Sequence, residues 1–275
     1  MPRRRCFDSP RPLLMGVLNV TPDSFSDGGC YLDPVLAVDR GLEMVSEGAD
    51  ILDVGGESTR PGATAVSEDV ELGRVLPVVE RLAANTDVPI SIDTRKARVA
   101  RFCVDRGTAI INDVSGLRDP AMVRVAAETG ASVVLMHMRG TPATMQRNTA
   151  YEDVVLEVRG YLQSQAQAAK RAGVREIAVD PGLGFGKTAR QNFEILGRLR
   201  DIADLGYPVV VGPSRKSFLG TLPSRLPVVD RLEGTLAAVA AAVMNGAAIV
   251  RVHDVPQCRR VLEVLVEVLE ACDGR

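Results

Sequence analysis

The chain alternates between short apolar runs and longer segments with helical periodicity, and no other feature restricts its possible folds as strongly. Runs rich in β-branched residues or leucine predict eight strands, at residues 14–19, 50–54, 89–93, 109–112, 132–136, 176–180, 208–212 and 248–252. Segments with helical spacing follow them and predict helices at residues 33–47, 68–84, 96–106, 120–129, 151–172, 190–203, 231–245 and 255–271. Because each helix carries the chain back to the start of the next strand, such repeated units build a parallel sheet.

Nothing in the sequence divides this pattern into two domains. Its 275 residues contain no long linker rich in proline, glycine or serine, and α/β barrels of about 250 residues form single domains. We therefore predict one α/β domain over residues 14–275, a single (β/α)8 TIM barrel, with a doubly wound open sheet as the alternative. Residues 1–13 are predicted to be a flexible N-terminal extension, because Asp8, Pro10 and Pro12 interrupt any apolar signal segment.

Composition excludes several classes of protein. With 46% hydrophobic and 25% charged residues, the chain has enough apolar surface for a large core. A formal net charge of −2 argues against a nucleic-acid partner, which would require a large basic surface. The longest apolar stretch, residues 236–250, contains Asn245 and fits a buried helix and strand better than a membrane span. Five cysteines without a C-x-x-C pair favour the cytoplasm over an oxidising compartment.

A polar residue stands at or just beyond the end of every predicted strand. The eight are Asn19, Asp53, Asp93, Asn112, His137, Asp180, Ser214 and Arg251. In a barrel these ends converge on one mouth, where active sites of this fold are built. An isolated Asp after a strand is commonly a helix N-cap, but His137 and Arg251 are poor caps, so capping does not explain the whole set.

Two of the loops after the strands are unusual. The first, residues 19–29, is long, rich in small polar residues and contains Phe25, which is typical of a mobile lid. The second, residues 53–62, is flanked by glycines and carries Arg60 near its tip, with a plain surface turn as the alternative interpretation.

Basic residues gather after the last two strands. Arg215 and Lys216 lie between two serines at a predicted helix start, where an anion would bind well. Arg251 and His253 alternate on one face of the final strand, so two cation-capable groups point the same way. Carboxylates and amides on one side of the mouth and cations on the other suit a substrate with an amide-like heterocycle and an anionic group.

The loop motifs closely resemble those of the dihydropteroate synthase family, in family order and over residues 14–255. They include Gly-Glu-Ser-Thr-Arg-Pro-Gly-Ala from residue 56, Asn-Asp-Val-Ser-Gly from residue 112 and Asp-Pro-Gly-Leu-Gly-Phe-Gly-Lys from residue 180. Asn-Val-Thr-Pro-Asp-Ser-Phe-Ser-Asp-Gly-Gly from residue 19, Ser-Arg-Lys-Ser-Phe-Leu-Gly from residue 214 and Arg-Val-His-Asp-Val from residue 251 complete the set. Pro213 departs from the usual pattern, because it fixes φ and removes an N–H before the Ser-Arg-Lys turn.

The resemblance implies a role for each matching residue. It assigns pterin binding to Asp93, Asn112, Met136, Asp180, Phe185 and Lys216. It assigns diphosphate binding to Asn19, Arg60, Arg251 and His253, with Asn19 also binding the expected cofactor, Mg²⁺. It assigns the para-aminobenzoate site to Phe25, Thr59, Pro61, Arg215 and Ser217, and catalytic roles to Asp23, Arg60, Asp93 and Lys216.

The implied reaction belongs to folate biosynthesis. Para-aminobenzoate displaces pyrophosphate from 6-hydroxymethyl-7,8-dihydropterin diphosphate through an SN1-like pterin cation, which gives 7,8-dihydropteroate. The resemblance also implies a cytoplasmic homodimer that sulfonamides inhibit. A non-catalytic pterin-binding paralogue and a methyltetrahydrofolate–corrinoid methyltransferase are the alternatives, although the methyltransferase would not need the Ser-Arg-Lys-Ser and Ser-Thr-Arg-Pro-Gly segments.

Overall fold

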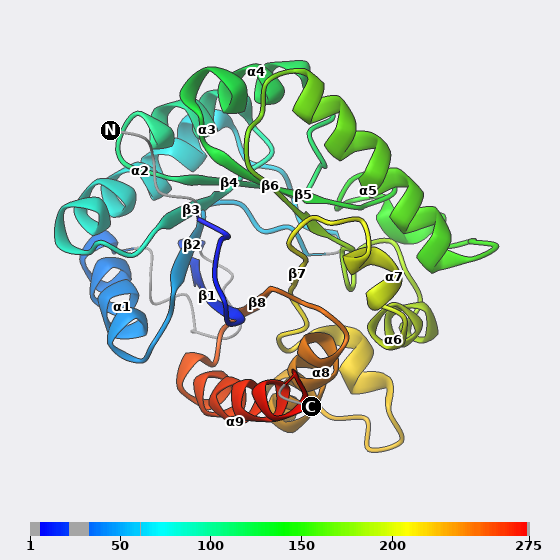
Figure 1. Cartoon of the computed structure of the whole chain (residues 1–275). Helices are drawn as coiled ribbons and strands as arrows, with labels where there is room; N and C mark the ends of the chain where they lie inside the picture. The colour runs from blue at the N-terminus through cyan, green and yellow to red at the C-terminus, as the bar shows by residue number, and fades with distance from the viewer. Residues whose placement is uncertain (1–5, 22–32, 61, 274–275) are drawn as a thin grey trace.

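The computed structural model describes residues 6–21, 33–60 and 62–273, and its strands form a parallel barrel with helices outside it (Figure 1). The strands are β1 Leu13–Asn19, β2 Ile51–Gly55, β3 Ile90–Asp93, β4 Ile110–Asp113, β5 Ser132–Met136, β6 Ile177–Asp180, β7 Val210–Val211 and β8 Ile249–Val252. They pair in the order β6-β5-β4-β3-β2-β1-β8-β7, and a parallel bridge between Val179 and Val209 joins the two edges. The (β/α)8 TIM barrel is therefore confirmed.

The helices match the predicted ones except in detail. They are α1 Pro34–Ser46, α2 Glu68–Asn85, α3 Ala97–Val104, α4 Pro120–Thr129, α5 Val154–Arg171, α6 Ala189–Gly197, α7 Arg200–Ala203, α8 Leu232–Met244 and α9 Val255–Asp273. Short 3-10 turns lie at Met145–Arg147, Ser217–Thr221 and Val228–Asp230. The single helix predicted at 190–203 is two helices, since α6 ends at Gly197, a poor helix former. Helix α5 starts at Val154 because the Asp153 side chain caps it.

The parallel register brings polar residues of neighbouring strands to one level. Gly55 of β2 pairs with Asp93 of β3, and Asp93 pairs with Asn112 of β4. Apolar strand residues such as Val54, Ile92 and Ile111 pack between the sheet and the helices, in the main hydrophobic core. The register thus places the carboxylates and amides at the carboxyl ends of the strands around one space.

The amino-terminal end of the barrel is closed by an apolar layer. Its buried members are Phe7, Met15, Ile51, Ile110, Val134, Ala178, Val210 and Ile249. The backbone N–H groups of Cys6 and Phe7 donate to the Glu176 carboxylate at 3.0 and 3.1 Å. In the described part of residues 1–13, the structure therefore differs from the predicted flexible extension. Phe7 packs into the barrel, and β1 already begins at Leu13.

In the part of the chain that the structure describes, every helix is too short or too polar to cross a membrane.

Candidate active site

A cavity of about 480 Å³ opens at the carboxyl ends of the strands. The predicted site residues on its wall are Asn19, Thr59, Arg60, Asp93, Phe185, Arg215, Lys216, Ser217, Arg251 and His253. These residues come from six different strand–helix loops or strand ends, so only the closed barrel brings them together.

Three predicted pterin-binding residues lie deeper than the open cavity wall. Asn112, Met136 and Asp180 are 4%, 3% and 7% exposed. The Asn112 side-chain amide donates to Asp53 at 3.0 Å, and Asp180 accepts from the backbone N–H of Gly182 at 2.6 Å. Burial raises the pKa of Asp180, against the lowering effect of the Gly182 hydrogen bond and Lys216. Met136 packs with Phe185 in a small apolar cluster.

Three further predicted residues, Asp23, Phe25 and Pro61, lie outside the described residues. The same holds for most of the predicted lid after β1. Their proposed roles therefore remain predictions.

Arg251 connects the two buried carboxylates under the cavity. Its Nε donates to Asp53 Oδ2 at 2.6 Å and its Nη2 to Asp93 Oδ2 at 2.8 Å. Burial raises the pKa of Asp93 to about 7, with Arg251 opposing and Asp53 adding to the rise. Within the described residues, Asp53 Oδ1 and Asp93 Oδ1 have no hydrogen-bond partner. The protein thus holds acceptor oxygens beneath the cavity that it does not satisfy itself.

Lys216 and Phe185 form another part of the cavity wall. The Lys216 ammonium lies 4.1 Å from the centroid of the Phe185 ring, which is a cation–π distance. Burial and the charge of Arg251 lower the pKa of Lys216 to about 8, although Asp180 and Asp93 act to raise it. The lysine stem packs against Gly184, whose φ of 80° suits glycine. A flat ring between this wall and the carboxylates would meet both a cation and hydrogen-bond acceptors.

His253 is not the cation that its position in the strand suggested. Burial and the charge of Arg251 lower its pKa to about 3, so the imidazole is neutral. Its backbone N–H donates to Ser214 Oγ at 3.2 Å, and its Nδ1 lies 2.9 Å from the same hydroxyl. With the hydroxyl proton directed at Nδ1, the other ring nitrogen carries a proton and is a neutral donor.

Arg215 lines the cavity with its charge already paired. Its guanidinium makes a bidentate contact with Asp254, at 2.9 and 2.5 Å. Its backbone is in the left-handed region at φ 54°, and its N–H donates to Thr235 at 3.0 Å. The turn after Pro213 keeps Ser214 bonded to His253, so the proline does not remove this contact.

His137 does not point into the same cavity as the other strand-end residues. It lines a separate space beside Arg118 and Tyr161, and its ring meets the Tyr161 ring edge-on with centroids 5.0 Å apart. Its Nδ1 lies 3.1 Å from the buried Lys187 ammonium. Burial and this charge lower its pKa to about 2. The expectation that all eight strand-end groups meet at one mouth is therefore wrong for His137, because it follows the strand by one residue and faces outward.

Several residues on the cavity wall carried no role in the sequence prediction. They include Thr21, Glu57, Met145 and Arg231. The sequence could have indicated Glu57, because an acidic residue between two glycines and a serine does not belong to a hydrophobic core. Met145 lies in a 3-10 turn without periodicity, and Arg231 stands at the start of a predicted helix, so neither position indicated a place on the cavity wall.

The donors at Asn19 are compatible with a magnesium ion. Its side-chain oxygen and Asp93 Oδ2 both lie close to Gly55, where the missing side chain leaves room between them. Hard oxygen ligands suit Mg²⁺, which takes most of its ligands from water and substrate phosphates rather than from a complete protein cage. The described residues contain no group of three or more His, Cys, Asp or Glu that could hold a metal.

The fold and the cavity define a class, a barrel enzyme whose mouth combines buried carboxylates with cations. Comparison with known proteins gives the family. Residues 15–253 match the family described as pterin binding enzymes. The dihydropteroate synthase of Escherichia coli K12 is 45% identical over 270 residues, which cover 98% of this chain and 95% of that protein.

Solved structures agree with this match. The Yersinia pestis dihydropteroate synthase, in a sulfonamide drug complex, superimposes with a TM-score of 0.92 at 42% identity and covers 96% of each chain. The Burkholderia cenocepacia dihydropteroate synthase complexed with 7,8-dihydropteroate has a TM-score of 0.88 at 43% identity, covering 97% of this chain and 94% of that one. The chain belongs to the pterin-binding enzymes and, within them, to the dihydropteroate synthase family.

Proposed function

We propose that the central cavity joins a dihydropterin diphosphate to para-aminobenzoate with release of pyrophosphate. The activity is that of a transferase that forms 7,8-dihydropteroate. The observation that carries the proposal is that Asp93, Lys216 and Phe185 line one cavity, with the buried Asp180 close enough to Lys216 to interact with its charge. A pterin presents several N–H donors and one carbonyl on a flat ring, which is the complement of such a surface.

The diphosphate is assigned to the rim. Arg60 supplies a positive charge from the loop after β2, and Arg251 has donors beyond those bound to Asp53 and Asp93. His253 contributes a neutral N–H rather than a charge. Asn19 would hold Mg²⁺, which would neutralise charge on the departing diphosphate. Leaving-group charge is thus stabilised on one side while Asp93 and Asp180 stabilise positive charge that develops on the pterin, as an SN1-like path requires.

The para-aminobenzoate site is proposed beside Thr59 and Ser217, which lie on the cavity wall. An aniline nitrogen is already an uncharged nucleophile, so orientation contributes more than a general base would. A sulfonamide that imitates para-aminobenzoate should compete for this space. If pyrophosphate and Mg²⁺ tighten drug binding, the drug must tighten pyrophosphate binding by the same factor.

We further propose that the enzyme works as a cytoplasmic homodimer. Val264 and Val268, four residues apart on α9, are 63% and 40% exposed and would form part of a surface for a second copy. Free thiols at Cys6, Cys103, Cys258 and Cys272 are compatible with a reducing compartment. Sedimentation of the purified protein would test the oligomeric state.

A coupled assay of pyrophosphate release tests the reaction. With the pterin diphosphate and Mg²⁺ present, release should depend on added para-aminobenzoate, and the product should absorb as 7,8-dihydropteroate. Release that does not respond to para-aminobenzoate would contradict the proposed acceptor.

A further inference from the structure

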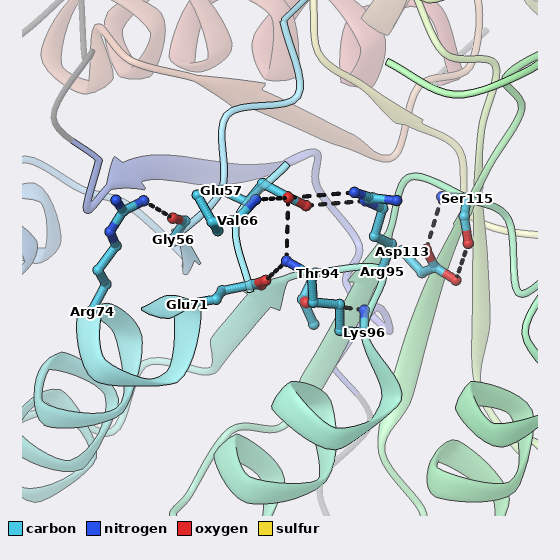
Figure 2. A network of polar contacts seen from close by, with 10 residues as sticks. All are labelled: Gly56, Glu57, Val66, Glu71, Arg74, Thr94, Arg95, Lys96, Asp113 and Ser115. Carbon is cyan, nitrogen blue, oxygen red and sulfur yellow. Dashed lines mark hydrogen bonds and ion pairs between the residues drawn. The ribbon is translucent and has the colours of Figure 1, made fainter. Parts of the chain in front are cut away.

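The loop between β2 and α2 is closed on itself by one carboxylate. Glu57 Oε1 accepts a hydrogen bond from the backbone N–H of Val66 at 2.9 Å, so both ends of the intervening loop meet at one side chain (Figure 2). Arg74 of α2 adds a second fastening by donating to the Gly56 carbonyl at 2.8 Å. A loop whose ends are fixed in this way loses much of its conformational freedom.

The same carboxylate fastens the loop to the neighbouring βα unit. Arg95 Nε donates to Glu57 Oε2 at 3.0 Å, and Lys96 Nζ lies 3.2 Å from Oε1 (Figure 2). Lys96 also contacts Glu71 Oε2 of α2 at 2.5 Å, and the Glu71 side chain is fully buried. Burial acts to raise the pKa of Glu57, but the Arg95 and Val66 hydrogen bonds and the charge of Lys96 outweigh it and leave the pKa lowered. Glu57 is therefore ionised at neutral pH.

The anchored loop carries groups that face the cavity. Glu57, Thr59 and Arg60 all line its wall, and further along the loop the Gly62 N–H donates to the Pro142 carbonyl at 3.3 Å. The loop thus leaves its anchor at β2 and reaches the loop after β5 on the other side of the mouth. A small rotation at its base would displace Thr59 and Arg60 from the substrates.

We infer that Glu57 is a positioning residue: its bonds to Val66, Arg95 and Lys96 fix the loop that presents Thr59 and Arg60 to the arylamine and the diphosphate. The inference rests on the proposed function for the chemistry of those two substrates. The pterin itself is bound by other elements, so the anchor affects the second substrate and turnover but not pterin affinity.

The opposite end of the barrel offers a matched control. Asp50 also accepts one backbone N–H and contacts two cations, with distances of 2.8 Å from Leu14 N, 2.7 Å from Arg11 and 2.6 Å from Arg259. Its side chain is 16% exposed, against 7% for Glu57. Asp50 therefore has the same chemistry without a connection to the mouth.

The experiment compares Glu57→Gln with Asp50→Asn in the full-length enzyme. Gln keeps an acceptor for Val66 but removes the charge that holds Arg95 and Lys96. We expect kcat/KM for para-aminobenzoate to fall about tenfold or more in Glu57→Gln, since small displacements of orienting groups cost factors of this size. Pterin affinity by calorimetry should stay within about twofold of wild type. Asp50→Asn should lower the melting temperature comparably and leave kcat/KM unchanged.

Hydrogen exchange gives a readout that does not depend on turnover. The amides of residues 58–66 should exchange faster in Glu57→Gln than in wild type or in Asp50→Asn. This result does not depend on catalysis. An inactive wild-type enzyme in the pyrophosphate assay would refute the proposed reaction but not the role of Glu57 in fixing the loop. Arg95→Gln, which removes one partner at a 30% exposed side chain, should show the same changes in weaker form if Glu57→Gln does not fold. Wild-type kcat/KM in Glu57→Gln, an equal loss in Asp50→Asn, or a parallel fall in pterin affinity would overturn the inference.

Discussion

At the amino-terminal end of the barrel, Phe7 and seven strand side chains form an apolar layer, whereas at the carboxyl end the same sheet buries Asp53, Asp93 and Asn112 beside the partly exposed Arg251. At the amino-terminal end the Glu176 carboxylate accepts hydrogen bonds from the backbone N–H groups of Cys6 and Phe7, although the Thr108 hydroxyl just before β4 has no partner among the described residues. At the carboxyl end, oxygens of Asp53 and Asp93 have no partner among the described residues. One end is thus built for stability and the other is left incomplete for a ligand.

The largest expected effect on stability comes from the apolar end. Phe7→Ala should lower the free energy of unfolding by about 3 kcal/mol, because it removes a buried aromatic ring from a packed layer. Turnover per folded molecule should not change. Urea denaturation and the pyrophosphate assay measure the two properties, with Phe102→Ala as a control at a ring that is 38% exposed. A loss of turnover in folded Phe7→Ala would mean that the two ends are coupled.

At the functional end, Arg60→Ala should reduce turnover by about 100-fold, a typical cost for losing one group that stabilises leaving-group charge. The melting temperature should hardly change, since Arg60 is an exposed loop residue. Binding of the free pterin should also persist, because the proposed position of the ring is beside Asp93 and Lys216 and not on the loop that carries Arg60. Steady-state kinetics and pterin calorimetry separate these effects, and an equal fall in both would contradict the assignment of Arg60 to the diphosphate.

Asp180→Asn should have the next effect, a loss of about tenfold or more in pterin affinity, because charge-assisted hydrogen bonds contribute about 1.5–3 kcal/mol each. The amide keeps one acceptor but replaces the other oxygen with a donor that faces the N–H groups of the pterin. Calorimetric titration of the folded variant measures the change. Unchanged affinity would mean that Asp180 is not part of the pterin site. Asp180 is buried and does not lie on the open wall of the cavity, so this measurement tests its assignment directly.

Most of the barrel, and the position of many of the named residues on the wall of one cavity, could be predicted from sequence, whereas the roles of those residues came from the family resemblance and stay predictions. Strand periodicity located the eight strand ends, and the ends of parallel strands must converge. The direction of His137 could not be predicted, since it follows β5 and faces Tyr161 rather than the cavity. The neutral state of His253 depends on burial by other segments. The anchor at Glu57 is formed with Val66 and Arg95, which no local pattern connects to it.

The smallest expected effect is a pH dependence at the functional end. Burial raises the pKa of Asp93 from its ordinary value of 3.8 to about 7 in the folded chain, so the folded state holds this proton more tightly than the unfolded state. The contribution of Asp93 to stability is therefore complete below the unfolded value and is lost as the pH rises through about 7. Asp93→Asn resembles the protonated form at every pH. Its melting temperature relative to wild type should rise by about 2 °C or more between pH 5 and pH 8. Other buried carboxyls with raised pKa values, Asp113 and Asp180, are present in both proteins, so their effects largely cancel in the difference. A melting-temperature difference between Asp93→Asn and wild type that stays constant or shrinks as the pH rises would mean that Arg251 keeps Asp93 ionised. The Asp93 carboxylate would then not destabilise the fold.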